Sequence, residues 1–141
     1  MKSACLYDLG LKLKHMMITE TSPQQAEHFD WLNAIDFYHS YLDIIKSRLN
    51  ALTESDSMGS IEQKVNYFSE KLNYLRECLG ELNNRVSAHI EELEIEPAFD
   101  NRLDRTLQSS HHMGLREKFE LYENEVSDFR TEFNKFYVRS I

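Results

Sequence analysis

Three stretches of this chain carry apolar residues at alternating steps of three and four. This spacing is typical of helices that keep one face turned toward partner helices. Pro23 suits the first position of a helix, and Pro97 marks a helix end because it disfavours helical backbone before it. The pattern predicts three long helices at about 23–53, 61–95 and 110–139.

We call the residues of each helix that follow this spacing its seam. The seam of the first predicted helix consists of His28, Trp31, Ile35, Tyr38, Leu42, Ile45, Leu49 and Leu52. The seam of the second consists of Ile61, Val65, Phe68, Leu72, Leu75, Leu79, Leu82, Val86, His89 and Leu93. The seam of the third consists of His112, Leu115, Phe119, Tyr122, Val126, Phe129, Phe133 and Phe136.

Helices of roughly 30 residues are about 45 Å long, and short connections make successive helices antiparallel neighbours. We therefore expect an all-α fold, an elongated antiparallel up-down-up bundle in one domain over residues 21–141. A capping box of Ser60 and Gln63 is expected to start the second helix. Residues 1–20 are expected to form a marginal helix or arm that adds a possible fourth helix.

The segment 97–110 is ambiguous, because its apolar residues suit a short helix while Ser109 and Ser110 offer a break or a cap. Its structure decides where the third helix begins. A start near Ser110 brings His112 toward one end of the bundle, whereas a helix continued backwards through 97–110 is expected to move it toward the middle.

Three seam positions hold histidine instead of an apolar residue: His28, His89 and His112. An up-down-up arrangement brings them toward the same end. Three imidazoles with a carboxylate or water suit zinc or another first-row metal, and Glu92 can share the face of His89. The other interpretation, which we favour at this point, is a polar layer that fixes helix register, because no helix carries metal-ligand spacing such as Glu-x-x-His.

A second apolar stripe lies off the seam of the first helix and consists of Phe29, Phe37, Tyr41 and Ile44. Exposed aromatic rows are typical of contact surfaces. Either residues 1–20 or a second subunit covers this stripe, and we favour a homodimer or a helical protein partner because residues 1–20 are short for a long rod.

The formal net charge of −8 argues against a nucleic-acid partner or an anionic membrane surface, which require basic residues. Cys5 and Cys78 are too few for a disulfide framework, so we expect free thiols and a cytoplasmic protein. No export signal or spanning segment is recognisable, and no motif indicates catalysis. We predict a protein that is not an enzyme.

Two resemblances agree with a bundle. Trp31 resembles the tryptophan that spectrin-type three-helix repeats bury in their first helix. Residues 27–49, EHFDWLNAIDFYHSYLDIIKSRL, are similar to the opening helix of small bacterial helical-bundle proteins without assigned activity. These resemblances imply a fold and no chemistry. The first hypothesis is thus an interaction or regulatory protein, and the alternative is a metal-binding bundle with a three-histidine end site.

Overall fold

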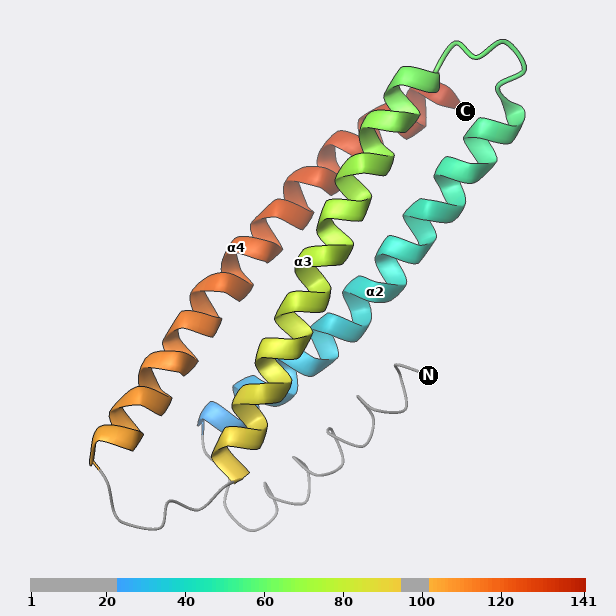
Figure 1. Ribbon diagram of the computed structural model, residues 1–141. Coiled ribbons are helices and arrows are strands. Elements are labelled where there is room, and N and C mark those ends of the chain that lie inside the picture. The colour runs from blue at the N-terminus through green and yellow to red at the C-terminus, as the bar shows by residue number, and fades with distance from the viewer. Residues whose placement is uncertain (1–22, 95–101) are drawn as a thin grey trace.

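The computed structural model describes residues 23–94 and 102–141 of the chain. This part consists of three helices, α2 (Pro23–Ser55), α3 (Glu62–Glu94) and α4 (Arg102–Ser140). They lie side by side in alternating directions (Figure 1), which confirms the predicted all-α bundle. In these two ranges, no helix is apolar enough over its length to cross a membrane.

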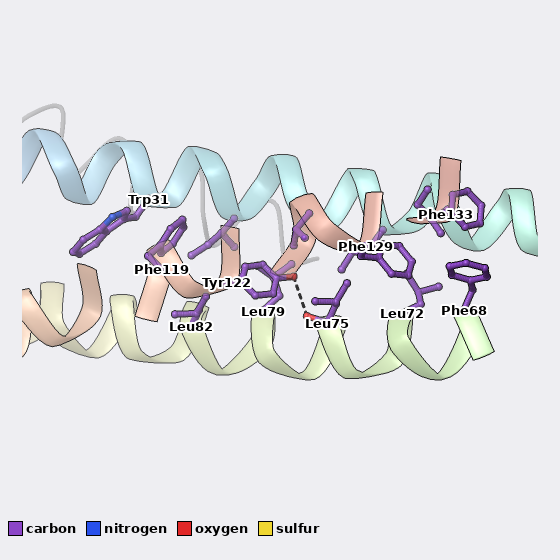
Figure 2. Close-up of a cluster of buried hydrophobic side chains, with 14 of the residues drawn as sticks. Trp31, Phe68, Leu72, Leu75, Leu79, Leu82, Phe119, Tyr122, Phe129 and Phe133 are labelled. Carbon is purple, nitrogen blue, oxygen red and sulfur yellow. Dashed lines mark hydrogen bonds between the residues drawn. The ribbon is translucent and has the colours of Figure 1, made fainter. Parts of the chain in front are cut away.

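The seams form the core. All apolar residues of the third seam are buried. Those of the first two seams are buried as well, except Tyr38 and Ile61, which are half-buried. The side chain of Leu93 is not described. Figure 2 shows these side chains meeting between the helices along the length of the bundle. Leu32 and Ile90 are also buried, next to seam positions, so the buried stripe is wider there than the heptad pattern predicts.

The helix α3 packs against both of its neighbours, whereas α2 and α4 meet mainly through large rings. Trp31 stacks on Phe119 with ring centroids 5.8 Å apart, and Tyr38 meets Tyr122 edge to face at 5.5 Å. The buried hydroxyl of Tyr122 donates a hydrogen bond to the backbone carbonyl of Leu75 at 2.9 Å (Figure 2). These aromatic pairs set the register of α2 against α4.

The turn between α2 and α3 is closed by Asp56 and not by the expected capping box. Its carboxylate accepts hydrogen bonds from the backbone N–H groups of Ser60 and Ile61, at 3.1 and 3.0 Å. Those groups have no partner inside the helix that follows, so an acidic side chain there stabilises the helix start. Gly59 adopts a φ of 67°, which a residue with a Cβ adopts only with strain.

The predicted start of the third helix near residue 110 is wrong. α4 begins at Arg102 and runs through Ser109 and Ser110, whose exposed side chains cost a solvated helix only about 0.5 kcal/mol each. The other helix bounds agree with prediction within two residues. The expectations for residues 1–20 and for 97–101 fall outside the described residues.

The core account predicts a large difference between two leucine substitutions. Leu79→Ala removes a side chain that is fully buried, and we expect it to lower the free energy of unfolding by about 2–5 kcal/mol. Leu121→Ala is the matched control because Leu121 is 61% exposed on α4. Urea unfolding followed by circular dichroism measures both, and equal losses would contradict the packing described.

Candidate metal centre

The three seam histidines come together at one end of the bundle. His28 lies in the second turn of α2, His89 lies near the end of α3, and His112 comes from α4. Their exposed fractions are 1%, 4% and 2%, and one ring nitrogen from each lies within 4.8 Å of the other two. The predicted meeting of these histidines is confirmed.

The expectation that a longer third helix would move His112 away from this end is wrong. α4 does begin at Arg102, yet His112 stays beside α2, with its ring centroid 4.9 Å from that of Trp31. The stacking of Trp31 on Phe119 fixes how far α4 is shifted along α2. The register of the helices therefore follows from seam packing. The added turns only lengthen α4 on the N-terminal side of His112.

Three nitrogens define the centre of the site. His28 Nε2 lies 2.9 Å from His112 Nδ1, and His89 Nε2 lies 3.3 Å from the same nitrogen. Zinc binds imidazole nitrogen at about 2.0–2.1 Å, so tetrahedral geometry separates two ligand nitrogens by about 3.3 Å. The His89–His112 pair matches this separation and the His28–His112 pair is a few tenths of an ångström shorter, while all three nitrogens lie within 4.8 Å of one another, so side-chain shifts must bring the His28 and His89 nitrogens to the same spacing.

The far side of His112 is held by an ion pair. Its Nε2 lies 2.6 Å from Oε1 of Glu27, and the guanidinium of Arg116 donates to both oxygens of that carboxylate, at 2.8 and 2.9 Å. The hydrogen bonds from Arg116, together with that from His112, lower the pKa of Glu27. An ionised carboxylate only accepts hydrogen bonds, so His112 carries its proton on Nε2.

A second carboxylate stands behind His89. Nδ1 of His89 lies 3.8 Å from Oε2 of Glu92 and is a buried nitrogen without a hydrogen-bond partner. The expected sharing of a face by His89 and Glu92 is thus confirmed. Carboxylates on the outer nitrogens of metal-binding histidines are usual, because they orient the ring and increase the basicity of the ligand nitrogen.

The proton positions leave one nitrogen of this cluster, Nδ1 of His89, without a hydrogen-bond partner. With its proton on Nε2, His112 offers a lone pair at Nδ1, which both His28 and His89 face. If His89 carries its proton on Nε2 and donates it to that lone pair, its Nδ1 has no proton and turns a lone pair toward the carboxylate of Glu92. If it carries the proton on Nδ1 instead, two lone pairs oppose each other at 3.3 Å. With His28 and His89 protonated on Nδ1, a cation at the centre binds all three lone pairs that face it, and the Nδ1 proton of His89 points toward Glu92.

Burial and the neighbouring imidazoles favour the uncharged forms of His28 and His89, whose pKa values are lowered. Burial, followed by the neighbouring His89 and His112, lowers the pKa of His28 to about 4. Burial likewise lowers the pKa of His89, with a smaller opposite effect from Glu92. Metal ligation requires neutral imidazole, so these lowered pKa values leave the nitrogens of His28 and His89 available at neutral pH.

The remaining histidines, and the ion pair of Glu27 with Arg116, can also be compared with what the sequence predicts. His111 is exposed, as expected from its position off the seam, and His39 lies elsewhere on α2. His15 lies outside the described residues. Sequence reasoning missed Glu27 and Arg116. The only signal was that Glu27 lies next to His28 and that Arg116 lies one helical turn after His112.

The predicted interaction stripe of α2 is divided in the structure. Phe37 is 60% exposed and Ile44 is 50% exposed, whereas Phe29 and Tyr41 are half-buried and pack against the core. The four residues therefore do not form one continuous exposed row. The exposed members, Phe37 and Ile44, follow His28 on α2 by more than two turns, so they and the histidine cluster remain two separate functional candidates.

No protein-family model matches this chain, and neither a curated protein nor a solved structure matches it. The resemblance of residues 27–49 to bacterial bundle proteins therefore stays a prediction.

The lowered pKa of His28 predicts a loss of stability in mild acid. The unfolded chain takes up this proton near pH 6.5 and the folded chain near pH 4, so the stabilisation is complete above 6.5 and disappears toward 4. The difference corresponds to about 3 kcal/mol. Urea unfolding in chelator at pH 7 and pH 5 should show a smaller loss for His28→Gln than for the unchanged protein, and parallel losses would refute the assignment.

Proposed function

We propose that this protein is a metal-binding helical bundle that holds zinc or another first-row transition metal ion through His28, His89 and His112. The observation that carries the proposal is the convergence of three buried ring nitrogens, two of which have carboxylates behind their rings. The previously favoured polar layer explains buried histidines in general. It leaves Nδ1 of the buried His89 without a hydrogen-bond partner, 3.8 Å from the carboxylate of Glu92.

The donor set favours particular ions. Imidazole nitrogen suits zinc, copper, nickel and iron, whereas magnesium and calcium prefer oxygen ligands. Zinc accepts three protein ligands in tetrahedral geometry and takes a water molecule or another ligand in the fourth position. We therefore propose Zn²⁺ as the first ion to test, with Co²⁺ as its spectroscopic substitute.

Each ligand comes from a different helix, which makes stabilisation of the bundle the direct consequence of binding. An ion held by α2, α3 and α4 ties their ends together, and its binding free energy adds to that of folding. The described site supplies no pair of groups with assignable acid and base roles. Our proposal is therefore a binding and structural role without catalysis.

A zinc titration tests this function. We expect one Zn²⁺ per chain, and a rise in unfolding free energy of about 2.7 kcal/mol when free zinc is 100 times the dissociation constant. The triple variant His28→Gln, His89→Gln and His112→Gln should lose both effects, whereas His111→Ala should keep both. Isothermal titration calorimetry and thermal unfolding measure them.

Two results would contradict metal binding and favour the polar layer as the role of the cluster. The first is the absence of stoichiometric zinc in calorimetry and elemental analysis of the unchanged protein. The second is a triple variant that retains metal content and thermal response. If the triple variant does not fold, the single variant His112→Gln serves as the test instead, because it removes one ligand and leaves two imidazoles in place.

A second candidate function is self-association, which we propose from the exposure of Phe37 and Ile44. These residues are seven positions apart and therefore project from the same face of α2, two turns from each other. An identical stripe on a second copy is complementary in antiparallel pairing about a two-fold axis. The buried hydroxyl of Tyr41, which lacks a hydrogen-bond partner, lies on the same helix between them.

Light scattering distinguishes this dimer from a monomer. We expect Phe37→Glu to weaken association by placing a charge in the contact, while helicity stays unchanged because the side chain is exposed. Leu121→Glu is the control, as it places the same charge at an exposed leucine on α4. A molar mass of one chain for the unchanged protein at high concentration would rule out self-association.

A further inference from the structure

The three ligand histidines are at most 4% exposed, so an ion reaches them only by a defined route. A cavity of about 350 Å³ lies between α3 and α4 at this end of the bundle. His89 lines it, together with Glu92 of α3 and His111 of α4. This cavity is therefore next to the proposed metal centre and shares one ligand with it.

Metal-binding groups continue from the surface to the site. The ring of His111 is 56% exposed, and its Nδ1 lies 3.4 Å from Oε2 of Glu92. The same oxygen lies 3.8 Å from Nδ1 of buried His89. Glu92 thus stands between an exposed imidazole and a buried one, within a few ångströms of both.

The ring of His89 forms the boundary between the cavity and the centre. Its Nε2 faces His112 at 3.3 Å, while its Nδ1 is buried, close to Glu92, and has no hydrogen-bond partner. One imidazole therefore offers a nitrogen to each side. A neutral imidazole has one unprotonated nitrogen at a time, so an ion passes across His89 when the ring proton moves from Nε2 to Nδ1.

The charges around the cavity are of both signs. Arg85 and Lys118 also line it, so a cation meets positive charge as well as Glu92. Arg85 is partly neutralised by Glu81, with the two side chains 2.9 Å apart. The pair of His111 and Glu92 therefore holds an ion more weakly than the three imidazoles beyond it.

We propose that this cavity is the entry route for a divalent first-row metal ion, in which His111 and Glu92 capture the ion and His89 passes it to the centre. The inference rests on the proposed metal-binding function. It assigns to His111 a role in the rate of binding and none in the final complex.

Stopped-flow mixing with Co²⁺ tests the route. Trp31 is the only tryptophan and its ring lies 4.9 Å from that of His112, so its fluorescence reports an ion with unpaired d electrons at the centre. We expect His111→Ala to slow association and dissociation severalfold and by the same factor, because it removes the exposed ligand that first meets the ion. The dissociation constant should then stay unchanged.

Met113→Ala is the matched control, because Met113 is also exposed, also flanks His112 and does not line the cavity. It should leave both rates as they are. Equal association rates for His111→Ala and the unchanged protein would overturn the route and leave the metal centre intact. Weaker equilibrium binding by His111→Ala at unchanged association rate would make it a ligand and also overturn the route. Absence of any Co²⁺ signal in the unchanged protein would overturn both proposals.

Discussion

The structure depends on a constraint at one end of its core, where three helices bury three imidazoles against one another and leave Nδ1 of His89 without a hydrogen-bond partner. A buried polar group without a partner costs about 1–3 kcal/mol, so this arrangement is stable only if the rest of the bundle enforces it. The heptad seams and the stacking of Trp31 on Phe119 provide that enforcement. An ion at the centre would convert the same cost into binding free energy.

The apolar and polar parts of the bundle therefore have different roles. The long core fixes helix register, and that register brings nitrogens from α2, α3 and α4 to within 4.8 Å of one another. The clamp of Glu27 and Arg116 then orients the ring of His112 and fixes its proton. Rigid helices with oriented side chains position a metal site better than loops, because each ligand is held by packing and by a hydrogen bond.

Much of this arrangement could be predicted from the sequence because it follows from a repeating pattern. The seams specify which faces are buried, and the histidines interrupt seams at positions that an up-down-up fold brings together. The start of α4 was missed because exposed serines such as Ser109 are compatible with either a break or a helix. Glu27 and Arg116 were missed because their pairing depends on the rotation of α2 against α4, which the heptad spacing leaves open by several degrees.

The central claim concerns individual nitrogen atoms, so nitrogen NMR of the imidazole side chains tests it most directly. The account predicts that metal-free His112 carries its proton on Nε2. It also predicts that one equivalent of Zn²⁺ shifts Nε2 of His28, Nε2 of His89 and Nδ1 of His112, while the other three of the six histidines stay unchanged. Unshifted resonances for these three nitrogens, or a response at His39 instead, would contradict it.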